Sequence, residues 1–494
     1  MQLNKEYIIF GRQIGYIVGY NIILLLLSFI QLPILTKGLG AALYGTWSLI
    51  TATISLIIPF VLLGLGEGTI RFLAAEKDKG RIREDFLSAC SVVFISGIAF
   101  SVFLFLLSDY LATFIFKDIN SSTYIKLASI LILLDSTSAL VVSFFRTFRK
   151  IGVYAIIGMI QSTFKVGLIV LSILLGYKLT GVIIATIITS ILFDVIILVI
   201  ILKQIGFQLP RFSHLKSYLR FGIPLAPTQA ILWIIHTSDR YMISYFIGAA
   251  ATGIYSAAYA IGQYTSFFMV PINVVLLPTI AKSYDEGNLN ETRNYLKYSV
   301  KYLMMTAIPA AFGLSILAKP ILQILATSEF IPGSVVVPLV AFGAMLFSFY
   351  GICVYIFHLV KRTELVVRLL GISAVLNIIF NILLIPRMGI LGAAVATLIA
   401  YGVLGMLTLM ITRRYLKFDI SISFILKSAF SSAIMLLCIW LINPELIVSV
   451  IISIFAGVLI YFGILLLLGG LSREELTFFV NFLKDSLRRI RAVK

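Results

Sequence analysis

The chain has 494 residues, of which 60% are hydrophobic and only 12% are charged. Soluble proteins carry about a quarter charged residues, so this composition excludes a water-facing globular fold. We attribute the net charge of +18 to basic residues that flank membrane spans and face anionic lipid headgroups, rather than to nucleic-acid binding.

Apolar runs follow one another along the chain, each bounded by charged residues, proline or glycine. A run of about 20 residues crosses the hydrocarbon core as an α-helix, whereas a transmembrane β-barrel needs alternating segments of about 10 residues. The sequence therefore predicts an all-α polytopic membrane protein with about 14 transmembrane helices. We place the spans at 14–36, 43–66, 86–108, 123–146, 153–175, 181–202, 221–247, 253–281, 296–318, 335–357, 365–386, 389–411, 422–442 and 446–470.

The basic residues predict the orientation of these spans. With a cytoplasmic N-terminus, 31 of the 39 lysines and arginines fall in inner segments and six in outer segments. By the positive-inside rule both termini are cytoplasmic, in a multi-pass protein of the cell membrane. Segment 471–494 has apolar residues at helical spacing and basic residues elsewhere on the wheel, which predicts an amphipathic helix on the inner leaflet.

A weak internal repeat divides the spans. The stretch LGAALYGTWS at Leu39 is similar to IGAAATGIYS at Ile247, and GVIIAT at Gly181 is similar to GAAVAT at Gly392. The offsets of 208 and 211 residues place spans 1–6 over spans 7–12 in the same orientation, a parallel repeat. We therefore predict an N-terminal lobe at 1–219, a C-terminal lobe at 220–418, two additional helices at 419–470 and the amphipathic helix at 471–494.

Three stretches resemble a known family. LPILTKGLGAALYGTWSLI at 32–50, GLGEGTIRFLA at 64–74 and SDRYMISYFIGAAATGIYSAAYAI at 238–261 are similar to Wzx-type polysaccharide flippases. These belong to the multidrug/oligosaccharidyl-lipid/polysaccharide exporter superfamily, and the resemblance covers essentially the whole chain. It implies a two-lobed transporter that moves a polyprenyl pyrophosphate-linked oligosaccharide to the outer leaflet by alternating access, for surface polysaccharide biosynthesis.

Two other functions stay open at this stage. One is a cation-coupled multidrug exporter with the same fold. The other is a membrane glycan polymerase, which the short outer loops with few acidic residues disfavour. We expect no enzyme activity, no catalytic residue and no metal site, because there is no P-loop and the three histidines are scattered. We expect a functional monomer without a cofactor, and leave open a coupling ion, H⁺ or Na⁺.

Charged residues inside spans are costly and are the first candidates for function. Asp135, Lys165 and Asp194 lie at similar depth in spans 4, 5 and 6. They form either a buried structural cluster or a cavity in which Lys165 is the cation for a pyrophosphate. Tyr154 and Gln161 share a helical face with Lys165, which favours a wet stripe.

Span 7 carries a second polar stripe that includes Trp233 and His236 and ends at Asp239 and Arg240. The last two either extend toward the outer headgroups or close an outer gate. Glu67 and Arg71 are four residues apart at the inner end of span 2, where a surface ion pair and an inner gate are the alternatives.

We assign these residues to a predicted substrate cavity and to predicted gates. Tyr255 and Tyr259 add an aromatic face in span 8 that either stacks on sugar rings or packs in the core. The cavity residues are Lys165, Gln161, Tyr154, Arg146, Arg71, Asp135, Asp194, Trp233, His236, Tyr255 and Tyr259, and the gate residues are Glu67, Arg71, Asp239 and Arg240.

Overall fold

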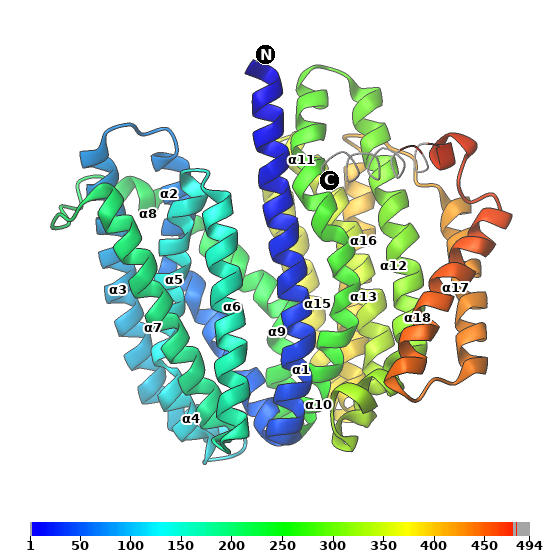
Figure 1. The fold of residues 1–494 in the computed structure, drawn as a ribbon, viewed down its shortest axis with the longest axis horizontal. Helices are drawn as coiled ribbons and strands as arrows, with labels where there is room; N and C mark the ends of the chain where they lie inside the picture. The colour runs from blue at the N-terminus through cyan, green and yellow to red at the C-terminus, as the bar shows by residue number, and fades with distance from the viewer. Residues whose placement is uncertain (1, 478–480, 482–494) are drawn as a thin grey trace, which may run out of the picture. The chain divides into compact units, whose positions relative to one another are not determined.

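The computed structural model describes residues 2–477 and 481. Within these residues all regular structure is helical and no strand occurs, which confirms the predicted all-α class (Figure 1). The predicted amphipathic helix at 471–494 lies largely outside the described residues.

Contacts divide the chain into two compact units, each assembled from separate segments. Unit 1 comprises 1–260, 322–336 and 363–404, and unit 2 comprises 261–321, 337–362 and 405–494. The division of the chain into lobes at 219 and 418 stays a prediction.

The helices of unit 1 begin with α1, in which both of the first two predicted spans lie. α1 (Gln2–Leu62) is interrupted only at Gly40, where φ is 73° and ψ is 174°. A side chain would be strained at this positive φ, so glycine allows the break that divides α1 between the predicted spans 14–36 and 43–66. The other elements are α2 (Leu65–Leu73), α3 (Lys79–Tyr110), η1 (Leu111–Ile115), α4 (Ser121–Ala128), α5 (Ile130–Thr147), α6 (Ile151–Leu174), α7 (Lys178–Ile205), α8 (Leu215–Gly222), η2 (Ile223–Leu225), α9 (Ala226–Phe246), most of α10 (Ala249–Gln263), η4 (Ser328–Val335), α15 (Thr363–Met388) and most of α16 (Ile390–Thr412).

Unit 2 holds the remaining helices. Its elements are η3 (Tyr264–Met269), α11 (Val270–Asp285), most of α12 (Leu289–Leu325), α13 (Val336–Cys353), α14 (Tyr355–Leu359), α17 (Ile422–Ile442) and α18 (Ile447–Leu467). A short 3₁₀ segment, η3, separates α10 from α11 just before Pro271. This proline stands in the first turn of α11, where its missing N–H leaves no hydrogen bond unmade.

Twelve described segments are long and apolar enough to cross a membrane. One of them, Val18–Leu62, has 45 residues and includes most of two predicted spans. Helix α9, which fills most of the predicted span 221–247, is not among the twelve. The chain is thus a multi-pass membrane protein, while the number of 14 spans stays a prediction.

The two copies of the repeated sequence meet in unit 1. The Oγ atoms of Ser48 and Ser256 lie 2.7 Å apart. A Cβ atom on Gly45 would lie 1.8 Å from the Ala249 carbonyl oxygen, and one on Gly253 would lie 2.0 Å from the Ala41 carbonyl oxygen. Each copy therefore presents a glycine to the backbone of the other, a reciprocal contact typical of paired small residues in membrane helices.

Candidate functional site

Helix α9 places a polar stripe inside unit 1, against α1 and α15. The Trp233 indole Nε1 donates to the Ala52 carbonyl at 2.9 Å. One turn further on, His236 Nδ1 lies 2.5 Å from the Tyr401 hydroxyl, which is 3.5 Å from the Tyr259 hydroxyl. Tyr259 and Tyr401 are both buried, so this part of the stripe is a hydrogen-bonded interior network.

The stripe continues to Asp239, which is buried, and Arg240, which is half-buried. Asp239 is only 1% exposed, and its carboxylate accepts from the Arg240 backbone N–H at 2.8 Å and from the Tyr255 hydroxyl. The Arg240 guanidinium lies 5.5 Å from the centre of the Tyr259 ring, a cation–π contact. Five of the predicted residues of spans 7 and 8 therefore form one cluster with Tyr401, namely His236, Asp239, Arg240, Tyr255 and Tyr259. The role of Asp239 and Arg240 as an outer gate stays a prediction.

Buried amides on α15 extend this cluster, and we did not predict them from the sequence. Asn377 Oδ1 accepts from the Asn381 side-chain amide at 2.9 Å and from the Ser238 hydroxyl at 3.4 Å. Asn377 Nδ2 donates to Thr397 Oγ1 at 3.3 Å. The sequence feature that could have revealed them is the pair of asparagines four residues apart in an apolar helix. A second hint is the threonine of the repeated stretch GAAVAT.

Asp135, Lys165 and Asp194 lie on α5, α6 and α7, respectively. Ser190 donates to Asp135 Oδ1 at 3.4 Å, and Asp194 is 8% exposed. Lys165 lies close enough for its charge to act on Asp135, yet among the described residues no ion pair within 4.0 Å joins Lys165 to either carboxylate. The half-buried lysine therefore lies near Asp135 without a direct ionic bond.

Arg146 and Tyr154 are brought together at one end of α5 and α6. With Tyr20, Asn21 and Ile151 they line a cavity of about 200 Å³. Gln161 lies further along α6 and is half-buried.

Glu67 and Arg71 are both exposed on α2. No ion pair joins them in the part of the chain that the structure describes. The Arg71 guanidinium instead lies 4.6 Å from the centre of the Phe221 ring.

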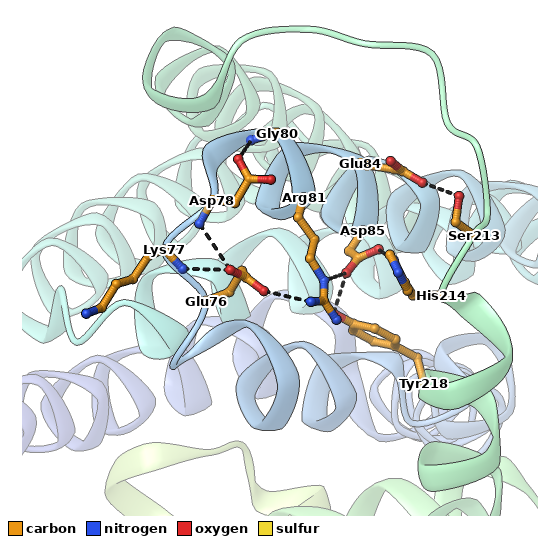
Figure 2. A network of polar contacts seen from close by, with 10 residues as sticks. All are labelled: Glu76, Lys77, Asp78, Gly80, Arg81, Glu84, Asp85, Ser213, His214 and Tyr218. Carbon is orange, nitrogen blue, oxygen red and sulfur yellow. Dashed lines mark hydrogen bonds and ion pairs between the residues drawn. The ribbon is translucent and has the colours of Figure 1, made fainter.

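A second polar network, shown in Figure 2, joins the start of α3 to the segment that leads into α8. The buried Asp85 carboxylate lies 2.9 Å from His214 Nδ1 and accepts from the Tyr218 hydroxyl at 3.1 Å. The Arg81 guanidinium lies 3.0 Å from Glu76 and 3.8 Å from Asp85. Burial and the neighbouring Asp85 carboxylate raise the pKa of Tyr218.

The same network contains three groups with metal-binding chemistry. Donor atoms of Glu84, Asp85 and His214 all lie within 4.8 Å of one another. The Ser213 hydroxyl donates to Glu84 at 2.5 Å, and Asp85 has the partners described above. These protein contacts account for the three side chains and attach Ser213 and His214 to α3.

Comparison with known proteins places the chain among exporters and flippases. It is 25% identical over 89% of its length to the probable low-salt glycan biosynthesis flippase Agl15 of Haloferax volcanii, of which 92% is covered. It is 30% identical to the probable lipid II flippase MurJ of Rhizobium meliloti over 40% of this chain and 38% of that one. An uncharacterized membrane protein, MJ1068 of Methanocaldococcus jannaschii, is 27% identical over about half of each chain.

The fold comparison agrees. The structure of a lipid II flippase MurJ in an inward closed conformation has a TM-score of 0.75, with 21% identity over 90% of this chain and 97% of that chain. An inward-facing multidrug resistance MATE transporter has a TM-score of 0.70, with 16% identity over 79% of this chain and 94% of that chain. Both show the shared fold.

Two family models match the chain. The MatE model matches residues 224–383. The model described as polysaccharide biosynthesis protein matches residues 10–284, which is more than half of the sequence. The chain belongs to this polysaccharide biosynthesis protein family, and the predicted membership of the multidrug/oligosaccharidyl-lipid/polysaccharide exporter superfamily is confirmed.

Proposed function

We propose that the protein is a flippase that moves a lipid-linked oligosaccharide from the cytoplasmic to the outer leaflet of the cell membrane, for surface polysaccharide biosynthesis. The observation that carries this proposal is the match to Agl15, a probable glycan biosynthesis flippase, over nearly the full length of both chains. The substrate is a sugar on a polyprenyl pyrophosphate. The protein works as a monomer by alternating access, with both termini in the cytoplasm, as the basic residues of the inner segments indicate.

Reconstitution tests this function directly. Vesicles containing the purified protein and a fluorescent lipid-linked oligosaccharide should make the sugar accessible on the opposite face, while protein-free vesicles should not. The MatE match and the MATE fold favour one second candidate, a cation-coupled drug exporter. Efflux of a cationic dye without sugar translocation would establish that candidate in place of the flippase.

We further propose that an ion, H⁺ or Na⁺, couples to transport at the buried cluster of α9 and α15. Asp239 is a carboxylate inside the unit, and the buried Asn381 Oδ1 has no hydrogen-bond partner within the described residues. Both are oxygen donors of the kind that hard cations prefer. If the ion couples here, an imposed Na⁺ or pH gradient accelerates flipping by the wild type but not by Asp239→Asn.

A further inference from the structure

The cavity beside Arg146 combines a cation with groups that recognise oxygen anions. Arg146 stands in the last turn of α5 and is exposed. Among the described residues no hydrogen bond or ion pair reaches its guanidinium, and none of the five lining residues is acidic. An unpaired guanidinium presents a planar fork of donors that fits a phosphoryl group.

The remaining polar walls of the cavity are fixed by packing. The Tyr20 and Tyr154 rings meet edge to face, with centroids 5.5 Å apart. A Cβ atom on Gly158 would lie 2.8 Å from the Tyr20 ring and hydroxyl, so glycine is what lets α1 bring this tyrosine so close to α6. Asn21, the next residue on α1, adds an amide. Two phenols and an amide therefore stand around the guanidinium.

Apolar surface continues from the cavity along α6. Val153 lies between the cavity residues Ile151 and Tyr154, and Ile156 and Ile160 follow them; these three side chains are exposed by 40%, 50% and 55%. Because α6 is a candidate membrane span, these side chains offer a surface to lipid chains. A ligand with a phosphoryl head and a hydrocarbon tail could thus contact both surfaces at once.

In the orientation that the basic residues predict, this cavity lies at the inner membrane face. Arg149 and Lys150 follow Arg146 in the turn between α5 and α6, an inner segment in the predicted orientation. Lys150 is already occupied, since it donates to Gln204 at 2.5 Å. Arg146, at the end of α5, therefore lines the cavity and has its guanidinium N–H donors available.

We propose that Arg146, Tyr20, Asn21 and Tyr154 bind the phosphoryl group of a polyprenyl-linked headgroup where it enters from the inner leaflet. This inference rests on the proposed flippase function and names the first binding position of its substrate. Tyr154, Gln161 and Lys165 lie at i, i+7 and i+11 of α6, so Lys165 is a second cation about 16 Å further into the membrane. During transport the phosphoryl group moves from the Arg146 site to Lys165.

A binding measurement in lipid nanodiscs tests the site with the full chain. Radiolabelled undecaprenyl pyrophosphate is titrated against the wild type in phosphatidylcholine, with phosphatidylglycerol as competitor. Arg146→Ala should weaken binding about tenfold or more, because a charge-assisted bidentate contact is lost. Arg146→Lys and Tyr154→Phe, which preserve the packing, should weaken it about threefold, since each loses one part of the contact.

The matched control is Arg149→Gln, which removes the same charge from the same turn but not from the cavity lining. It should leave affinity within about twofold, as expected for a screened surface charge. Wild-type affinity in Arg146→Ala, Arg146→Lys and Tyr154→Phe would overturn the site. Equal displacement by phosphatidylglycerol would assign the phosphoryl site to ordinary phospholipid and overturn the polyprenyl ligand.

The same variants separate this inference from the proposed function. If the wild type flips the lipid-linked sugar while Arg146→Ala binds and flips normally, the entry site is wrong and the flippase stands. If binding depends on Arg146 but the wild type flips no lipid-linked sugar, the site stands and the flippase proposal fails.

Discussion

The reciprocal contact between the two copies of the repeat leads to a quantitative prediction for Gly45→Ala. The new Cβ atom would lie 1.8 Å from the Ala249 carbonyl oxygen and 2.8 Å from the Gly253 nitrogen. Both are backbone atoms, which cannot rotate away as a flexible side chain can. The two helices must separate by more than about 1 Å, which weakens the neighbouring contacts as well.

Overpacking of this kind costs about 1–3 kcal/mol, and a rigid backbone neighbour places Gly45→Ala at the upper end. The Ser48–Ser256 hydrogen bond of 2.7 Å lies one turn away and would lengthen, which costs about 0.5–1.5 kcal/mol more. We therefore expect Gly45→Ala to lose about 3.5–4.5 kcal/mol of the free energy of unfolding.

The assay is thermal and denaturant unfolding of the detergent-purified protein, followed by tryptophan fluorescence. Gly167→Ala is the matched control, because a Cβ atom at this position in α6 meets nothing within 4 Å. There alanine should be neutral or stabilising by up to about 1 kcal/mol, as expected in a helix interior.

A double-mutant cycle sharpens the test. Gly253→Ala should destabilise by itself, because its Cβ atom would lie 2.0 Å from the Ala41 carbonyl oxygen. Once one methyl group has separated the helices, the second costs less, so the double variant should lose at least about 0.5 kcal/mol less than the sum of the single losses. Additive losses, or a loss in Gly45→Ala no larger than in Gly167→Ala, would refute the close contact.

Three further predictions concern charged side chains. Burial alone would raise the pKa of Glu475, but hydrogen bonds from Lys301 at 2.6 and 2.7 Å and from Ser472 hold it below its usual value. The stabilisation by this ion pair should therefore be fully present above the usual glutamate pKa and lost as pH falls through the lowered pKa. Glu475→Gln should then reduce the free energy of unfolding by about 3 kcal/mol at pH 7 and by much less at pH 3. An equal loss at both pH values would contradict this. Asp85→Asn should release the segment 206–214, seen as faster limited proteolysis there, with Glu84→Gln as a milder comparison; unchanged cleavage would mean that other contacts hold the segment. Lys165→Ala should abolish flipping while Lys165→Arg retains some, whereas equal stability loss with normal transport per folded molecule would make the lysine structural.

The sequence alone predicted the all-α membrane class, and the structure confirms it. The length of an apolar run and the charges at its ends are local properties, and the bilayer converts them directly into helices. The two spans predicted at 14–36 and 43–66 are indeed separated, because the non-helical backbone at Gly40 divides α1 into two helices. The three similar sequence stretches also identified the superfamily.

The grouping of side chains required the tertiary structure. Helical spacing placed Trp233, His236 and Arg240 on one face of span 7, but it did not reveal Tyr401 of α16 as the partner of His236. Asn377 was missed for the same reason, since its partners Ser238 and Thr397 lie on other helices.

The contact between Gly45 and Gly253 shows both what the sequence could predict and what it could not. Similar residues at an offset of 208 indicated a repeat, yet only packing shows that its two copies meet. Periodicity specifies which residues share a helical face, while the helix that covers this face depends on contacts hundreds of residues apart in the chain. The sequence by itself thus determined membrane class and family, and only the tertiary structure decided which of the polar residues lie together inside the protein.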